Sequence, residues 1–310
     1  VYLVMNDGPH ISPSWIAVDW GTSNLRAWAM DAGGAILAEA GSDEGMGKLT
    51  RSGFEPALLR VIGPWLEAGP VPVVACGMVG SRQGWCEAPY RTVPCAPLEA
   101  SAQAIAPTVD PRLQVHIAPG LKQLSSPDVM RGEETQIAGA LRLVPNYDGI
   151  FCLPGTHSKW AQISAGEVVS FQTFMTGELF ALLSESSVLR HGMQGGGWDE
   201  GAFDAGVSDA LSRPERIAAR LFALRAEGLI AGLAPAAARS RLSGLLIGIE
   251  LAAARPYWLG QRVTLIGAET LSAAYARALA TQGVEAQTLP ATACTLAGLA
   301  SLAPLTEAAR

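Results

Sequence analysis

The amino-acid sequence predicts two α/β lobes, each a mixed sheet that opens with an antiparallel meander and is flanked by helices. Short apolar runs alternate with segments of helical periodicity along the chain, which is typical of α/β proteins. A strand, a polar turn containing Gly-Thr and a further strand occur in this order twice, around residues 20 and 155. We interpret this as an internal repeat of architecture and expect a cleft between the two lobes.

Length and composition agree with this interpretation. The 310 residues are enough for two lobes of roughly 150 residues each. Hydrophobic residues make up 49% and charged residues 16%, so each lobe can bury a core. The net charge is −6 and no basic run occurs, so the electrostatic footprint of a nucleic-acid-binding protein is missing.

The cysteines and the hydropathy indicate a cytoplasmic protein. The five cysteines are scattered and form no CxxC pair, so we expect reduced thiols and neither a disulfide framework nor a zinc site. No run of 18 apolar residues occurs, and we expect no membrane segment. Residues 1–4 are interpreted as an extension before a natural start at Met5.

The first lobe is expected to span residues 14–146. A meander of three short strands precedes a helix with apolar residues at helical spacing. Two apolar strands follow, each ending in glycine, and then a helix whose small residues permit close approach of another element. The expected strands are residues 15–19, 27–30, 35–38, 71–76 and 115–118, and the expected helices are 54–66 and 132–141.

The second lobe is expected to span residues 147–292 and to begin after a turn at 145–149. It repeats the opening of the first lobe and then becomes largely helical. A last helix within residues 293–310 is expected to complete the first lobe. The expected strands are 149–153, 160–163, 166–171 and 262–266, and the expected helices are 180–189, 202–211, 215–227, 236–254, 271–281 and 294–302.

The first polar turn has the composition of a phosphate clamp. Asp19 ends an apolar strand and supplies a hard oxygen that could hold Mg²⁺, through water because this ion keeps much of its hydration. Gly21 lets the backbone approach a phosphate, and the side chains of Thr22, Ser23 and Asn24 can donate hydrogen bonds. An ordinary polar β-turn is the alternative for this stretch taken alone.

The second polar turn has the same character. Gly155 permits close backbone approach, and Thr156 and Ser158 offer hydroxyl groups. His157 and Lys159 could add further donors. Each turn alone could be structural, but two such turns in parallel lobes favour phosphate binding. No G-x-x-x-x-G-K-[ST], strand-linked G-x-G-x-x-G, H-E-x-x-H or G-x-S-x-G motif offers a competing reading.

Charged residues near the start of the helix at 132–141 are candidates for chemistry. Glu133 or Glu134 could act as a general base toward a hydroxyl group, although acidic residues also simply favour a helix N-terminus. The sequence does not choose between them. Arg131, and also Arg26, could bind a substrate carboxylate bidentately, a geometry that lysine cannot supply. Arg82 is a further candidate for this contact, although a solvated surface arginine is the default interpretation.

The glycine-rich stretch after the strand at 71–76 is a candidate substrate site, because open α/β sheets bind ligands at the carboxyl ends of their strands. The alternative is an ordinary turn with its tryptophan in the core. The candidate substrate-binding residues in this stretch are Gly77, Met78, Gly80, Ser81 and Trp85.

These motifs carry a resemblance to a known superfamily. Asp19-x-Gly21-Thr22-x-x-x-Arg26 resembles the first phosphate motif of the actin/hexokinase/Hsp70 ATPases. Gly155–Lys159 resembles the second phosphate motif, and Ile266-Gly267-Ala268 resembles the adenosine motif. Together with residues 75–85, 130–136, 175–179 and 242–248, they resemble the 2-dehydro-3-deoxygalactonokinase family from about residue 15 to residue 300.

The resemblance implies two ribonuclease H-like lobes and an ATP- and Mg²⁺-dependent kinase. ATP contacts would include Gly267 and Ala268 besides the two turns. The implied reaction phosphorylates the 6-hydroxyl of 2-dehydro-3-deoxy-D-galactonate. The alternatives are a kinase of the same fold for another sugar acid or polyol, and an actin- or Hsp70-like ATPase switch. We expect a small-molecule substrate and neither nucleic acid nor membrane as partner, and a homodimer is an open alternative.

Overall fold

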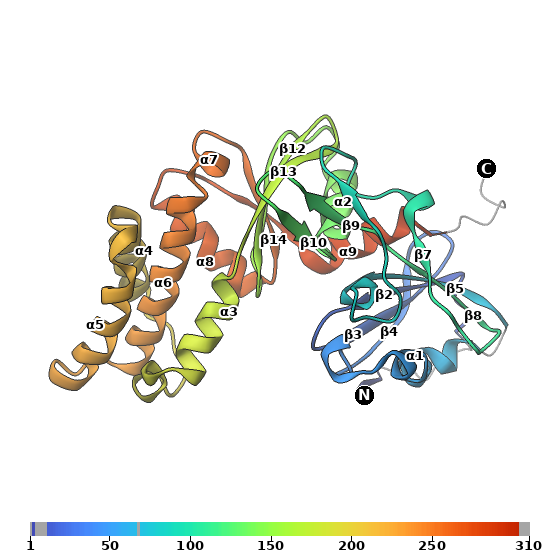
Figure 1. Cartoon of the computed structure of the whole chain (residues 1–310), viewed down its shortest axis with the longest axis horizontal. Coiled ribbons are helices and arrows are strands. Elements are labelled where there is room, and N and C mark those ends of the chain that lie inside the picture. The colour runs from blue at the N-terminus through green and yellow to red at the C-terminus, as the bar shows by residue number, and fades with distance from the viewer. Residues whose placement is uncertain (1, 4–10, 67–68, 304–310) are drawn as a thin grey trace. The chain divides into compact units, whose positions relative to one another are not determined.

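The computed structural model describes residues 2–3, 11–66 and 69–303, and the chain divides into two compact units (Figure 1). Unit 1 comprises Val1–Tyr147, Ala165–Val169 and Ala291–Arg310, and unit 2 comprises Asp148–Ser164 and Ser170–Pro290. The predicted lobes assigned residues 165–169 to the second lobe. The structure differs there because Cys95 and Val168 exchange backbone hydrogen bonds of 3.3 and 2.9 Å within unit 1.

The main sheet of unit 1 has the strand order β1-β4-β3-β2-β5-β8-β7. Its centre is an antiparallel meander of β2, β3 and β4, and β5 and β8 continue it in parallel with β2. The strands are β1 Tyr2–Leu3, β2 Trp15–Trp20, β3 Leu25–Met30, β4 Ile36–Ser42, β5 Val71–Gly77, β7 Ala104–Ile105 and β8 Leu113–Ile117.

The sheet of unit 2 repeats this arrangement in the order β13-β12-β11-β14-β15. β11 and β12 are antiparallel, and β14 and β15 continue in parallel with β11. A meander followed by two parallel strands in both units is the ribonuclease H-like arrangement, so the predicted fold class is confirmed. The strands are β11 Gly149–Leu153, β12 Ser158–Ser164, β13 Glu167–Phe174, β14 Val263–Gly267 and β15 Gln287–Pro290.

Unit 1 also contains a small three-stranded sheet that the sequence did not predict. β6 Tyr90–Thr92 and β10 Asp128–Met130 flank β9 Gly120–Gln123. Its strands have three or four residues and lack an apolar run, so they gave no periodic signal.

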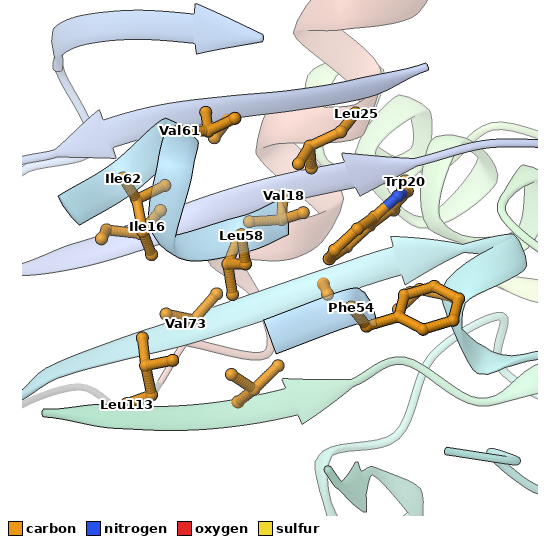
Figure 2. Packing of buried hydrophobic residues seen from close by; sticks show 14 of the residues in the cluster. Ile16, Val18, Trp20, Leu25, Phe54, Leu58, Val61, Ile62, Val73 and Leu113 are labelled. Carbon is orange, nitrogen blue, oxygen red and sulfur yellow. The ribbon is translucent and has the colours of Figure 1, made fainter. Parts of the chain in front are cut away.

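One face of the unit 1 sheet packs on α1 Phe54–Ile62. Side chains of β2, β3 and β5 belong to the same buried cluster as this helix, and Figure 2 shows Val18 of β2 and Val73 of β5 beside Leu58 of α1. Trp85 belongs to the same cluster, is 5% exposed and stacks on Phe54 with ring centroids 6.2 Å apart. Trp85, predicted as a substrate contact, thus contributes to the core of unit 1, and a role in substrate binding stays a prediction.

The opposite face of this sheet is covered by the C-terminal helix α9 Ala291–Ala300, which packs on α2 Glu133–Leu143. The two helices approach so closely that only glycine fits at two positions. A Cβ atom on Gly139 would lie 1.7 Å from the carbonyl oxygen of Cys294, and one on Gly298 would lie 2.0 Å from that of Thr135. The small residues predicted to permit close approach do so.

Helices make up most of unit 2 outside its sheet, and none in the described part of the chain is long and apolar enough to cross a bilayer. A single helix predicted at 180–189 is instead α3 Thr176–Ala181 followed by the π-helical turn η6 Leu182–Ser186. The other helices are α4 Glu200–Ser212, α5 Ile217–Ile230, α6 Pro235–Ala253, α7 Arg255–Trp258 and α8 Glu269–Ala280. The 3₁₀ segments of both units are η1 Met46–Lys48, η2 Arg51–Gly53, η3 Gly63–Trp65, η4 Met78–Gly80, η5 Ala100–Ala102, η7 Val188–Gly192 and η8 Pro214–Arg216.

The helix crossing in unit 1 can be tested by one added methyl group. We expect Gly139→Ala to lower the free energy of unfolding by about 2 kcal/mol or more, because two backbones must separate. Gly228→Ala is the control, since a Cβ atom there meets nothing within 4 Å and alanine favours helix α5 by up to about 1 kcal/mol. Urea denaturation measures both, and equal stability of the two variants would contradict the packing described here.

Candidate functional site

The first polar turn connects β2 and β3 in unit 1. Asp19 and Arg26 are paired in the register of the two strands, and an Arg26 Nη2 atom lies 2.5 Å from Asp19 Oδ2. The Asp19 side chain is 22% exposed, so the carboxylate remains accessible. The N–H of Gly21 donates to the carbonyl of Asn24 at 3.0 Å and closes the turn.

A loop that contains Gly45 and Gly47 packs against the backbone of this turn. The N–H groups of Gly45, Met46 and Gly47 donate to the carbonyls of Ser23, Gly21 and Thr22 at 2.9–3.2 Å. A Cβ atom on Gly45 would lie 2.2 Å from the Ser23 backbone, so this contact requires glycine. The loop engages the carbonyl groups of the turn, while the residues Thr22, Ser23 and Asn24 are exposed. The turn thus exposes residues that carry hydroxyl and amide groups to solvent.

The end of β5 and the start of α2 meet beside Asp19. Gly77 has φ +93° and Gly132 has φ +109°, backbone conformations that side chains other than glycine rarely adopt. A Cβ atom on Gly77 would lie 2.8 Å from the Trp20 carbonyl oxygen, and one on Gly132 would lie 3.3 Å from the Gly77 Cα atom. The approach places α2 against the strand end that carries Asp19.

The two glutamates at the start of α2 differ in accessibility. The Glu133 carboxylate accepts the Arg131 N–H at 3.1 Å and the residue is partly exposed. Both Glu134 carboxylate oxygens accept the Gly132 N–H at 2.9 and 2.8 Å, and Glu134 is completely buried. Burial, and next the negative charge of Glu133, raise the pKa of Glu134 to about 8. Of the two, only Glu133 is therefore accessible to solvent.

Arg131 is held inside unit 1 with one nitrogen uncommitted. Its side chain is 8% exposed, Nη2 donates to the Ala88 carbonyl at 2.8 Å, and the guanidinium lies 4.2 Å from the Tyr90 ring centre. Arg131 Nη1 and the Ser81 hydroxyl are buried without a hydrogen-bond partner among the described residues. Buried polar groups of this kind are rare and costly, and an oxygen atom of a carboxylate or of water would satisfy each of them.

Gly80 and Met78, two further predicted substrate contacts, both belong to η4. A Cβ atom on Gly80 would lie 3.0 Å from Arg131 Nη1, so glycine leaves room for the guanidinium. Met78 is half-buried in η4. Tyr90, which orients Arg131, escaped the sequence analysis because β6 carries no periodic signal and lies 41 residues from its partner.

The second polar turn lies between β11 and β12 in unit 2. Its backbone is fixed by the start of α3, where a Cβ atom on Gly177 would lie 2.3 Å from the Gly155 carbonyl oxygen. The Glu178 N–H donates to the Thr156 carbonyl at 3.0 Å, and the Glu178 carboxylate lies 2.6 Å from His157 Nε2. Lys159 Nζ donates back to the His157 carbonyl at 3.2 Å.

Ser158, predicted as a phosphate contact, has its side chain in the interior of unit 2. It is completely buried at the start of β12, and its hydroxyl is 2.8 Å from the Tyr275 hydroxyl. The reason is the alternation of side chains along a strand, which turns Ser158 toward the interior of unit 2.

A pocket of about 290 Å³ opens beside this turn within unit 2. Gly267 and Ala268, predicted to contact adenosine, end β14 and begin α8 near Pro154 but do not line the pocket. The next turns of α8 line it instead, and mostly apolar side chains form its walls. The lining residues are Gly155, Thr156, Thr176, Gly177, Phe180, Ser243, Leu246, Ile247, Leu271 and Tyr275.

Comparisons with known proteins point to one family. A model of the family described as 2-keto-3-deoxy-galactonokinase matches residues 19–302. A protein of Rhizobium meliloti named probable 2-dehydro-3-deoxygalactonokinase is 40% identical over 300 residues, which cover 93% of this chain and 96% of that protein. The 2-dehydro-3-deoxygalactonokinase of Escherichia coli is 36% identical over 292 residues, with coverage of 93% and 97%.

A solved structure is similar over the same length. It is a crystal structure of a protein from Sinorhizobium meliloti described as a candidate 2-dehydro-3-deoxygalactonokinase, with 38% identity and a TM-score of 0.86. The alignment covers 93% of this chain and 97% of that one.

The raised pKa of Glu134 predicts a pH dependence of stability. Between the unfolded value of 4.5 and the folded value of about 8, the folded state keeps a proton that the unfolded state releases. Stability therefore falls as pH rises through this range. We expect Glu134→Gln to reduce the fall between pH 5 and pH 8 by on the order of 2–4 kcal/mol, measured by urea denaturation.

Glu133→Gln is the matched control for this measurement. It removes a smaller cause of the raised pKa and should leave most of the fall in place. A Glu134→Gln variant whose stability falls as steeply as that of the wild type would show that Glu134 is not the titrating group.

Proposed function

The chain belongs to the 2-keto-3-deoxy-galactonokinase family, and from this premise we propose that it transfers the γ-phosphoryl group of ATP to the 6-hydroxyl of 2-dehydro-3-deoxy-D-galactonate. The observation that carries the proposal concerns the short segment at the start of α2. It contains the buried Arg131, whose Nη1 atom has no hydrogen-bond partner among the described residues, and the Glu133–Glu134 pair. A sugar acid needs a cation for its carboxylate and a base for its reacting hydroxyl.

The substrate carboxylate would bind Arg131. Its approach supplies the acceptor that Arg131 Nη1 and the Ser81 hydroxyl lack, and a charge-assisted hydrogen bond to a buried guanidinium is among the strong ones. Ala88 and Tyr90 hold the guanidinium in one orientation before substrate arrives. Arg26 suits this role less, because Asp19 already occupies one of its nitrogens.

Glu133 would accept the proton of the 6-hydroxyl as that oxygen attacks the γ-phosphorus and the bond to the ADP oxygen breaks. Glu133 is partly exposed, whereas Glu134 is buried and keeps its proton below about pH 8. A group that already carries a proton cannot accept one. Glu134 instead holds the Gly132 N–H and with it the start of α2.

Asp19 would hold Mg²⁺ together with water and phosphate oxygens. Within the described residues no three Asp, Glu, His or Cys side chains gather into a metal cage, and one accessible carboxylate suits an ion that keeps its water. When bound, Mg²⁺ neutralises negative charge on the phosphates. The exposed groups of Thr22, Ser23 and Asn24 would donate to the phosphate oxygens.

The nucleotide would use the pocket of unit 2. Phe180, Leu246 and Leu271 offer apolar surface for a purine, and the pocket volume is close to the lower end of ligand sites, about 300 Å³. Gly155 and Thr156 belong both to the pocket and to the polar turn. A purine in the pocket would therefore have its phosphates next to the turn. His157 and Lys159 remain candidates for further phosphate contacts.

The substrate class is tested by ADP formation with 2-dehydro-3-deoxy-D-galactonate, its C4 epimer and matched neutral sugars. We expect turnover only with the acids and a preference for the galactonate. Arg131→Lys should raise the KM for the acid by about tenfold or more, because a lysine ammonium lacks the planar fork that holds the Ala88 carbonyl through one nitrogen and offers another to the substrate carboxylate. The exposed Arg82, changed to Lys, is the control.

Two results would contradict this assignment. Slow ATP hydrolysis that no sugar acid accelerates would favour an ATPase switch. An unchanged KM in Arg131→Lys would place the carboxylate elsewhere.

The base is tested by comparing Glu133→Gln with Glu134→Gln. We expect Glu133→Gln to lower kcat by about 100-fold or more, because no group then accepts the hydroxyl proton, while ADP affinity is unchanged. Glu134→Gln should retain more activity. Steady-state kinetics and calorimetry measure both, and the reverse order of the two kcat values would reject Glu133 as the base.

A further inference from the structure

We propose that Glu250 is a positioning residue for the nucleotide, a role that rests on the proposed use of ATP. Glu250 lies on α6, is 1% exposed and does not line the pocket. It holds together the strand that follows the second polar turn and two walls of the pocket. It would therefore set ATP affinity through other residues, without touching the nucleotide.

Three hydrogen bonds converge on the Glu250 carboxylate. Trp160 Nε1 donates to Oε1 at 2.7 Å, and the Tyr275 hydroxyl donates to Oε2 at 2.7 Å. The Thr176 hydroxyl also donates to Oε2. These donors come from β12, α8 and α3, so one carboxylate joins three elements to α6. Thr176 and Tyr275 are both residues that line the pocket.

The network reaches the polar turn through Ser158. The Tyr275 hydroxyl has one proton, which it donates to Glu250, so the 2.8 Å contact with Ser158 requires the Ser158 hydroxyl to donate to Tyr275. The hydrogen bonds therefore run from Ser158 to Tyr275 and from Tyr275 to Glu250. The Ser158 proton is committed to the interior, and Ser158 anchors the end of the turn.

The energetics favour a positioning role over a stabilising one. Burying a carboxylate is costly even when it is hydrogen-bonded, and an apolar side chain of similar volume would avoid that cost. A fully bonded buried network, on the other hand, rigidifies its members. Burial raises the pKa of Glu250, and the hydrogen bonds to its carboxylate, that from Thr176 first, oppose this effect. The carboxylate is thus the acceptor around which the pocket is ordered.

The test compares Glu250→Gln with the wild type in KM for ATP, KM for the sugar acid and ADP affinity by calorimetry. Glutamine keeps the volume but offers one acceptor oxygen to three donors. We expect KM for ATP and the ADP dissociation constant to rise by roughly tenfold, the equivalent of one strong hydrogen bond, while KM for the sugar acid stays within about twofold. Glu250→Asp should recover part of the ATP affinity.

Two further variants keep the test decisive. Trp160→Phe removes one donor from a residue that does not line the pocket, and it should raise KM for ATP in the same direction if Glu250→Gln fails to fold. Asp204→Asn, which breaks the ion pair between α4 and Arg277 of α8, is the control for general loss of stability and should leave KM for ATP unchanged.

The inference is overturned if Glu250→Gln and Trp160→Phe lower the melting temperature but leave ATP and ADP affinity at wild-type values. It is also overturned if both substrates lose affinity equally. A wild-type protein that does not use ATP would instead reject the proposed function, so the two failures are distinguishable.

Discussion

The close approach of three backbone segments at Gly77 is the constraint on which the candidate site in unit 1 depends. A side chain at Gly77 would strike the Trp20 carbonyl, and one at Gly132 would press on Gly77. Because no side chain intervenes, the start of α2 reaches the strand end that carries Asp19. The residues beside Gly132 then bring a guanidinium and two carboxylates to the same region. Positioning of this kind is the main contribution a protein makes to phosphoryl transfer.

In unit 2 the polar turn is held in place by a different interaction. The strands of this unit repeat the order of unit 1, and the polar turn follows the corresponding strand. Here the groups around the turn are ordered by a buried carboxylate, Glu250, which accepts hydrogen bonds from three elements. Backbone contact between Gly177 and Gly155 adds a second restraint on the same turn. A glycine-containing turn is therefore fixed in each unit. In unit 1 backbone contacts hold it, and in unit 2 a side-chain network is the main restraint.

The sequence predicts what local patterns encode. Apolar runs gave β2, β5, β11 and β14, and the repeated polar turns gave the ribonuclease H-like arrangement. Partners distant in sequence leave no such signal: Tyr90 meets Arg131 across 41 residues, and Glu250 meets Trp160 across 90. Trp85 and Ser158 were assigned to ligands because they lie beside motif glycines, yet each turns inward to fill the core or to join a buried network. Tertiary packing decides whether the side chain of a residue near a turn points toward solvent or toward the core. The spacing of residues in the sequence does not contain this information.

The central claim is that the sugar acid binds between Arg131 and Glu133 at the start of α2. A crystal structure of the protein with ADP and 2-dehydro-3-deoxy-D-galactonate tests it most directly. The account predicts a carboxylate oxygen within about 3.2 Å of Arg131 Nη1 and the 6-hydroxyl within hydrogen-bonding distance of the Glu133 carboxylate. A sugar acid bound through Arg26, with Arg131 Nη1 still unpaired, would contradict it.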